Sequence, residues 1–226
     1  MTHRIFLPLL ALPVGALSSN AAVSSFYVDF GPGNNTTVGN YNNVTVTGVS
    51  ESSQSFTLVD SEGSSADNYG FSATSADQLS GTNDATNLTP YTTPFELTAN
   101  QDSIYFDNGE TMTVTLSNLD VGLTYDLTMF SSRASTSSRI TQFELTAGTL
   151  SGNTVVQLQT MNNQGNTVGF SGVTPDVSGN ITFEVQQNTS FGYINALEIT
   201  AVPEPSTYVI LMGVCGLGFA LWRRRQ

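Results

Sequence analysis

Runs in which apolar and polar residues alternate recur along most of the chain. Met112, Val114 and Leu116 are separated by threonines, and Phe183 lies between Thr182 and Glu184 in a similar run. A period of two is typical of a β-strand with one buried face. We predict strands at these two runs and at 26–30, 44–47, 55–59, 104–106, 127–129, 142–146 and 191–199.

The spacing of these runs indicates the fold class. The stretch 107–109 (Asp-Asn-Gly) supplies a turn between two predicted strands. Only 73–79 offers a helical turn, and the polar stretch 61–94 is expected to be a surface excursion with little regular structure. We find no internal repeat. The sequence therefore predicts one all-β domain at 22–200, an antiparallel β-sandwich or jelly roll.

The amino-terminal segment has the layout of a secretory signal peptide. Arg4 precedes a mostly apolar run from Ile5 to Leu17, and the small residues Ser19 and Ala21 permit cleavage after Ala21. We predict a signal peptide at 1–21 and export by the Sec route.

The carboxyl-terminal segment, 201–226, predicts a membrane-spanning helix at 208–222. This run has no charged residue, and three arginines follow it directly. Fifteen helical residues reach about 22 Å, short of a hydrocarbon core of about 30 Å, but aromatic ends and snorkelling arginines allow the helix to span. The arginines should remain cytoplasmic and fix the topology. They are Arg223, Arg224 and Arg225.

Three features in order therefore mark this end: a Pro-Glu-Pro motif, a short apolar helix and an arginine cluster. Together they resemble the PEP-CTERM sorting signal. The resemblance implies recognition by exosortase in a Gram-negative bacterium, removal of the membrane helix, and delivery to the cell surface or extracellular polysaccharide matrix. A plain single-span anchor after a proline-rich linker is the alternative. The sorting and processing motif comprises Val202, Pro203, Glu204 and Pro205.

Composition restricts the chemistry that the body of the protein can perform. The single histidine, cysteine and tryptophan are His3, Cys215 and Trp222, all in the terminal segments, and the chain has no lysine. The body thus lacks the base of a Ser-His-Asp or Cys-His system and the usual zinc ligands. Carboxylate chemistry and calcium remain open.

Charge argues against nucleic acid as a partner. The stretch 22–200 holds 17 acidic residues and two arginines, a net charge of −15. Such a field repels phosphates and disfavours acidic polysaccharides except at the arginines or through bridging divalent cations.

Three further sequences of the body, at 28–31, 123–130 and 192–199, carry a second resemblance. They are similar to galactose-binding-like β-sandwich domains, which often occur as carbohydrate-binding modules. It implies the sandwich fold and, as an expectation, a glycan ligand.

Candidate glycan contacts are few. Tyr41, Tyr69 and Tyr91 lie in loop-like sequence and could form a sugar platform or simply pack the loops. Arg133 and Arg139 flank a loop of small residues and could grip a carboxylate or sulfate, or form ordinary surface ion pairs.

Carboxylates provide the other candidates. Asp60, Glu62 and Asp67 gather oxygen ligands for calcium in one loop, although an acidic, solvated loop is the alternative. Asp29 and Asn195 form a second calcium candidate if the first and last strands pair at an edge.

For catalysis, a glycosidase needs two facing carboxylates, for which Asp102, Asp107 and Glu110 are candidates. The leading hypothesis is nevertheless a non-enzymatic exported protein, structural or adhesive in an exopolysaccharide or biofilm matrix. The alternative is a carbohydrate-binding module, calcium-dependent in one form. A carboxylate-based glycan hydrolase or lyase is the third hypothesis.

Overall fold

The computed structural model describes residues 24–46, 53–65, 67–75, 79–82, 85–86, 88–107 and 109–203. The predicted signal peptide at 1–21 and the predicted span at 208–222 lie outside these residues. Within them, no helix is both long and apolar enough to cross a bilayer.

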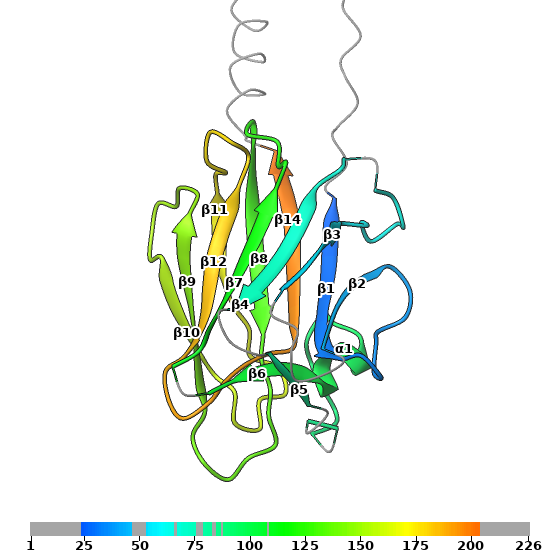
Figure 1. The fold of residues 1–226 in the computed structure, drawn as a ribbon, viewed down its shortest axis with the longest axis vertical. Helices are drawn as coiled ribbons and strands as arrows, with labels where there is room; N and C mark the ends of the chain where they lie inside the picture. The colour runs from blue at the N-terminus through cyan, green and yellow to red at the C-terminus, as the bar shows by residue number, and fades with distance from the viewer. Residues whose placement is uncertain are drawn as a thin grey trace, which may run out of the picture.

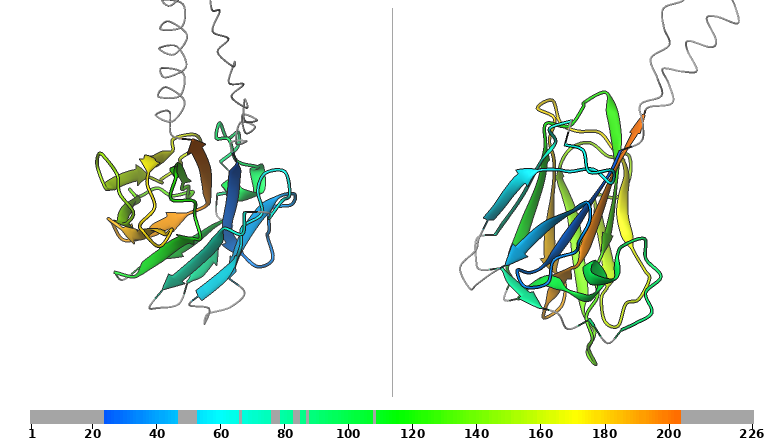
Figure 2. Two further views of the ribbon diagram at one scale, coloured as in Figure 1. Left: turned by 90° about the horizontal axis from the view of Figure 1, so that it is seen from above. Right: turned by 90° about the vertical axis from the view of Figure 1, so that its right-hand side faces the viewer.

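Two large sheets face each other and form a sandwich (Figures 1 and 2). The first sheet has the order β11-β8-β14-β1-β2, and all its neighbours are antiparallel except β1 and β2. Its strands are β1 (Ser25–Pro32), β2 (Tyr41–Val46), β8 (Leu123–Phe130), β11 (Val168–Val173) and β14 (Ala196–Pro203).

The second sheet is antiparallel throughout, with the order β10-β9-β12-β7-β4-β3. A short third sheet, β13-β6-β5, lies across one end of the sandwich (Figure 1). The second sheet comprises β3 (Ser53–Thr57), β4 (Gly70–Ser75), β7 (Thr111–Ser117), β9 (Ile140–Ala147), β10 (Val155–Gln159) and β12 (Ile181–Gln187). The remaining elements are β5 (Ser80–Thr82), β6 (Ser103–Phe106), β13 (Gly192–Ile194) and the helix α1 (Leu97–Gln101).

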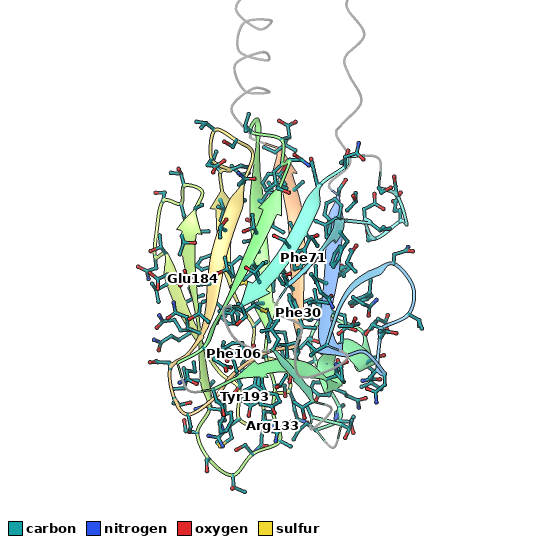
Figure 3. The ribbon with its side chains drawn as sticks, in the orientation of Figure 1. Phe30, Phe71, Phe106, Arg133, Glu184 and Tyr193 are labelled. Carbon is teal, nitrogen blue, oxygen red and sulfur yellow. The ribbon has the colours of Figure 1, made fainter. Side chains whose placement is uncertain are left out.

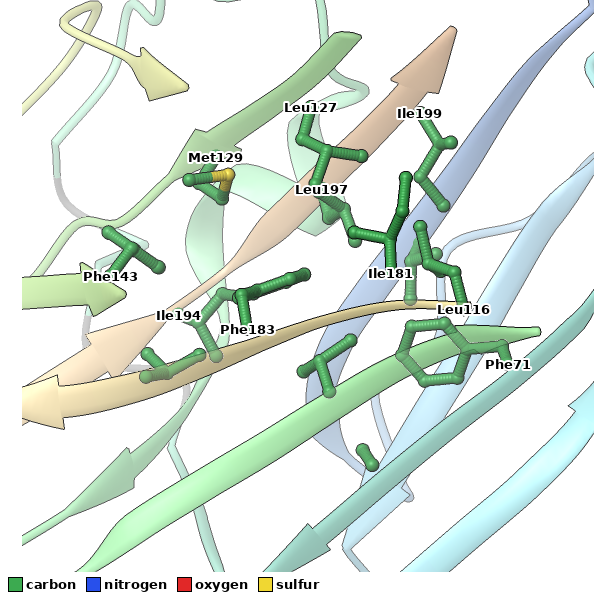
Figure 4. Packing of buried hydrophobic residues seen from close by; sticks show 14 of the residues in the cluster. Phe71, Leu116, Leu127, Met129, Phe143, Ile181, Phe183, Ile194, Leu197 and Ile199 are labelled. Carbon is green, nitrogen blue, oxygen red and sulfur yellow. The ribbon is translucent and has the colours of Figure 1, made fainter. Parts of the chain in front are cut away.

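The apolar positions of the alternating runs fill the space between the sheets. Strand β7 buries every second residue, and so does β12, so their polar threonines face outward. Opposite them, Leu127 and Met129 of β8 and Leu197 and Ile199 of β14 are at most 1% exposed. Figure 4 shows these side chains meeting between the layers. The predicted antiparallel sandwich is confirmed, with the β1–β2 pair as its one parallel exception among the described strands.

The stretch 61–94 differs from its prediction. Two strands, β4 and β5, lie within it, and the helical turn predicted at 73–79 is wrong over 73–75, which belong to β4. Ala73 is fully buried and pairs with Val114 of β7 and Gln54 of β3. Phe71 and Ala73 are the only apolar side chains of β4, and its other residues are small or polar, so its sequence does not read as a strand.

Both ends of the described domain lie at the same end of the sandwich. Ser25 pairs with Thr200, and the backbone N–H of Ala201 donates to the carbonyl of Ser24 at 3.0 Å. The last strand continues to Pro203, so residues 201–203 of the predicted sorting segment pair with 123–125 of β8. The short sheet of β5, β6 and β13 lies at the opposite end (Figure 1).

Candidate functional site

A cavity of 330 Å³ opens at the end of the sandwich that is formed by the short sheet. Its wall combines aromatic rings with two arginines, and we call it the arginine–aromatic pocket. Figure 3 shows two of its residues, Arg133 and Tyr193, at the end of the sandwich opposite the start of β1 and the end of β14. The pocket is lined by Gly81, Thr82, Tyr105, Arg133, Arg139, Phe191 and Tyr193.

Strand pairing brings the three aromatic residues together. Tyr193 of β13 stands directly opposite Tyr105 of β6, and their ring centroids are 6.1 Å apart. Phe191, at the entry to β13, lies 6.2 Å from the Tyr105 ring and 6.4 Å from the Tyr193 ring. Tyr193 is almost fully buried, whereas Tyr105 and Phe191 are half-buried and offer ring surface to a ligand.

The loop between β8 and β9 places both arginines against these rings. The Arg133 guanidinium lies 5.6 Å from the centroid of Tyr193, and that of Arg139 lies 4.6 Å from the centroid of Phe191. Arg133 Nη1 donates to Thr82 Oγ1 at 3.1 Å, and Arg139 Nη1 donates to Ser190 Oγ at 2.6 Å. Arginine stacked on an aromatic ring keeps its edge N–H groups directed at other acceptors.

Backbone and buried side-chain hydrogen bonds hold the arginine loop in place. The N–H of Arg133 donates to the Thr160 carbonyl, and its carbonyl accepts from Asn162. Ser132 N–H donates to Asn195 Oδ1 at 2.7 Å, next to the start of β14. The pocket is therefore built on fixed elements, which favours preorganised binding.

The two arginines also alter the electrostatics of Tyr193. Burial raises the pKa of its phenol above the ordinary value, while the positive charges of Arg133 and Arg139 oppose that rise. The phenol is therefore neutral at physiological pH, and the guanidinium groups remain the charged groups of the pocket.

A second cavity lies beside the first and is rich in side-chain amides. The segment 159–162 separates them: Gln159 Oε1 accepts from the N–H groups of Arg139 and Met161, and Met161 forms a β-bridge with Arg133. We call this 630 Å³ cavity the amide-lined pocket. It is lined by Pro90, Thr92, Gln159, Met161, Asn162, Asn163, Gln164, Gly165 and Asn166.

None of the three tyrosines predicted as sugar contacts lines either cavity, although Tyr91 lies between two lining residues of the amide-lined pocket. Tyr69 is in the main core, where its ring packs on Tyr125, so a sugar cannot reach its face. Tyr91 donates to the carbonyl of Ala85 at 2.6 Å and packs edge-on against Phe130.

Tyr41 lines a separate cavity of 230 Å³. Its hydroxyl accepts from the N–H of Glu96 at 2.9 Å, and its ring stacks on Tyr27. Burial raises the pKa of Tyr41 to about 12. A tyrosine held on two sides in this way stabilises the start of β2, where it lies.

The acidic loop predicted to bind calcium forms a turn that is closed by its own hydrogen bonds. Asp60 Oδ1 accepts from the N–H groups of Glu62 and Ser64, which makes it the cap of a turn. Glu62 and Asp67 are exposed. The part of the chain that the structure describes has no group of three or more His, Cys, Asp or Glu side chains placed to hold a metal ion.

Asp29 and Asp102 instead form a buried acidic pair, at 1% and 0% exposure. Strand β1 pairs with β14 as predicted, but inside the sheet rather than at an edge. Asp29 Oδ2 accepts from the N–H of Thr37 at 2.8 Å. Its Oδ1, both carboxylate oxygens of Asp102 and Thr37 Oγ1 have no hydrogen-bond partner within the described structure.

Burial raises the pKa of Asp102 to about 9, and repulsion from the Asp29 carboxylate adds to the rise. Burial likewise raises the pKa of Asp29. The Asp102 carboxyl lies against Gly31, where the methyl group of an alanine would approach Asp102 Oδ2 to 2.0 Å. The pair must therefore hold a proton or a cation, because two ionised carboxylates without a counter-charge are unstable in a buried site.

The other two carboxylates predicted for catalysis form a turn. The N–H of Glu110 donates to the carbonyl of Asp107 at 2.9 Å, closing the chain reversal between β6 and β7. The predicted turn therefore joins two strands that belong to different sheets.

Sequence reasoning identifies the two arginines but misses Tyr105, Phe191 and Tyr193 as their partners. Alternation with Gly192 places Phe191 and Tyr193 on the core face of the final predicted strand. The sequence does hold one signal for the pocket: this aromatic pair directly follows the polar run 186–190. Aromatic residues beside such a polar run indicate a solvent-accessible site rather than a buried core.

Comparison with known proteins gives one family match. Residues 201–225 match the model of the PEP-CTERM protein-sorting motif. No curated protein matches the chain.

Several solved structures show a distant likeness to the domain. TmCBM61 in complex with β-1,4-galactotriose has a TM-score of 0.35 at 12% identity, with 57% of this chain and 86% of that chain covered. The family 11 carbohydrate-binding module from Clostridium thermocellum has a TM-score of 0.29 at 8% identity, with coverage of 58% and 87%. The enzymatically active domain of tailspike protein 4 from bacteriophage CBA120 has a TM-score of 0.35 at 13% identity, with coverage of 58% and 19%.

The Pro-Glu-Pro resemblance is thereby confirmed, and its position can be related to the fold. The matched segment begins at Ala201, within β14, where the backbone is still paired with β8. The chain carries a PEP-CTERM protein-sorting motif at residues 201–225, joined directly to the last strand of an all-β sandwich.

Proposed function

We propose that the protein is an exported surface protein that binds carbohydrate in the arginine–aromatic pocket and acts as an adhesive component of an extracellular matrix. The observation that carries this proposal is the pocket itself. Three aromatic rings and two arginines from separate segments of the chain converge on one cavity. Half-buried rings offer apolar faces to a sugar ring, and arginine N–H groups match its oxygen atoms.

Binding to a glycan array tests this proposal. The full-length chain, kept in a detergent without a sugar headgroup, should bind a defined set of glycans. Tyr105→Ala should reduce that binding at least tenfold, because it removes a half-buried ring from the wall of the pocket.

Tyr41→Ala serves as the matched control, since Tyr41 is half-buried in a different cavity. It should leave binding unchanged in a protein whose melting temperature shows that it is folded. Loss of binding in Tyr41→Ala alone would move the site to that cavity, and no binding to any glycan would refute the function.

The same proposal includes a calcium site, which we place at the buried acidic pair rather than in the acidic loop at 60–67. Asp29, Asp102 and Thr37 supply four buried oxygen atoms without hydrogen-bond partners, and calcium takes its ligands from such oxygens. These residues fit a calcium ion, whose positive charge would neutralise the two carboxylates. The site would tie β1 to the loop 33–40 and to the segment after α1.

Thermal unfolding tests the calcium proposal without reference to glycans. The melting temperature of the full-length chain should rise in millimolar calcium relative to EGTA, and Asp102→Asn should abolish the rise. Equal melting temperatures of the wild-type protein in both buffers would assign the pair to a shared proton instead.

The sorting proposal rests on the PEP-CTERM motif. We propose that the precursor is exported by the Sec route, held in the inner membrane of a Gram-negative bacterium by the segment 208–222, and processed by exosortase near Val202 to Pro205. Mass spectrometry of the protein from cells with and without exosortase tests this, and retention of residues 208–222 in both strains would refute it.

We further propose that the protein is not an enzyme. The carboxylate pair of Asp29 and Asp102 is sealed from solvent, and Asp107 and Glu110 form a turn. A glycan that binds on the array should therefore be recovered intact after prolonged incubation. Shortened or unsaturated products would instead support a hydrolase or a lyase.

A further inference from the structure

We infer that the ligand of the arginine–aromatic pocket is an acidic glycan, in which a carboxylate or sulfate group of one sugar unit binds at Arg139 beside Arg133. This inference rests on the proposed carbohydrate-binding function and specifies its ligand class. Four features of the domain support it.

The first is the distribution of charge. Residues 22–200 contain 17 acidic residues and only two basic ones. Both basic residues line the same cavity, although they are six positions apart in an irregular loop. A neutral sugar needs no such concentration of positive charge, whereas an anion can approach this acidic domain only where the local field is positive.

The second feature is the environment of Arg139. Its guanidinium lies on the Phe191 ring and donates to the Ser190 hydroxyl, both of which are neutral partners. Its Nε is buried without a hydrogen-bond acceptor. A buried donor of a charged group without an acceptor is costly, and an anionic ligand within reach of the guanidinium would lower that cost.

The third feature is the orientation of the rings. Phe191 lies beneath the Arg139 guanidinium, while Tyr105 is half-buried next to it. One face of the pocket is thus suited to an apolar sugar face and one edge to a charged substituent. A uronic acid or a sulfated sugar has this combination in a single ring.

The fourth feature is the neighbouring amide-lined pocket. Gln159 borders it and also accepts the N–H of Arg139, so one residue connects the two cavities. Its wall is neutral and carries several amides, which suit hydroxyl groups. A glycan chain with an acidic unit beside Arg139 can therefore extend a further unit over the segment 159–162, and oligomers should bind more tightly than the acidic monosaccharide.

The test compares acidic glycans with uncharged forms of the same chains. The full-length protein is applied to an array of uronic-acid and sulfated glycans together with neutral ones, all in EGTA. The strongest acidic ligand is then compared with its methyl ester or desulfated form by titration. We expect the uncharged form to bind at least tenfold more weakly, and binding of the acidic form to weaken as salt is raised.

Variants of Arg139 test whether this residue recognises the charged group of the glycan. Arg139→Gln should weaken binding of the acidic glycan at least tenfold with little effect on its uncharged form, and Arg139→Lys should recover part of the loss. Val177→Glu is the control, because it makes the same change of one unit in net charge at a fully exposed position. It should leave affinity unchanged, and melting temperatures establish that each variant is folded.

The outcomes separate this inference from the proposed function. Equal binding of the charged and uncharged forms, or a set of neutral ligands only, overturns the acidic ligand while carbohydrate binding stands. Binding that needs added calcium and survives Arg139→Gln assigns recognition to a bridging cation and also overturns it. Absence of binding to every glycan, both in EGTA and in added calcium, contradicts the proposed function itself.

Discussion

Asp102 shows how far burial can move a single residue from its ordinary chemistry. Its carboxyl is fully buried, faces the carboxyl of Asp29 and has a pKa raised to about 9. Since an unfolded aspartate has a pKa near 4, the folded protein binds a proton that the unfolded chain releases over this interval. In the absence of a cation, stability must therefore fall as the pH rises from about 4 to about 9.

Asp102→Asn should remove that pH dependence. The amide keeps the shape of the side chain without its charge, so in EGTA the variant should be more stable than the wild type at pH 8 by about 1–3 kcal/mol. Denaturant unfolding at pH 5 and pH 8 measures the effect. The difference in slope between the wild type and the variant should not exceed about 1.4 kcal/mol per pH unit, the value for one proton. A wild-type protein of constant stability across this range would contradict the proton-binding pair.

Gly192 lies between two pocket residues, and its lack of a side chain is required by the core beneath. A methyl group at this position would lie 2.2 Å from Cε2 of Phe106, which is 1% exposed. Gly192→Ala should therefore destabilise the protein by about 1–3 kcal/mol, because the Phe106 ring must move.

Gly152→Ala provides the matched control, since a methyl group there meets no atom within 4 Å. Denaturant unfolding of both variants gives the comparison. Equal stability of the two would show that the Phe106 ring shifts without cost.

At the scale of elements, the strands that can be predicted are those with one buried face and one face exposed to solvent. The runs that form β7 and β12 alternate strictly, and both lie in the middle of their sheet. Strands β10 and β11 escape prediction because their apolar positions do not alternate strictly: β10 begins with two adjacent valines, and a register shift interrupts β11. The five-residue helix α1 is too short for helical periodicity to show.

The candidate site is only half predictable for a similar reason. Two arginines stand out in a sequence with no other basic residue in its body. Their aromatic partners come from β6 and β13, which are 86 or more residues apart along the chain. Only the register between these strands places Tyr105 opposite Tyr193, and alternation within one strand does not reveal its partner.

Phe183 tests the central role of β12. Its side chain is fully buried between the sheets, and its strand joins β7 to β9. Phe183→Ala should cost about 3–5 kcal/mol of unfolding free energy, as truncation of a large core side chain leaves a cavity. Val177→Ala, at a fully exposed position, should change stability by less than about 0.5 kcal/mol. A small effect at Phe183 would mean that the facing sheets close over the cavity.

At the scale of the whole molecule, the sorting motif and the domain share residues. Ala201 is buried, and 201–203 pair with β8, so this part of the motif is not available to a protease while the sandwich is folded. We predict that the mature protein ends at or after Pro203. Its intact mass measures this directly. A mature end before Ala201 would mean that processing occurs before β14 joins its sheet.

Because β1 starts and β14 ends at one end of the sandwich, any attachment through the carboxyl-terminal segment holds the molecule by that end. The arginine–aromatic pocket is at the other end (Figure 3), and the eight residues of β14 that run between the two ends span roughly 25 Å. A cell decorated with this protein would therefore present the pockets as an outermost layer. Neighbouring cells, or loose polymer drifting past, would meet the binding sites before they met the envelope.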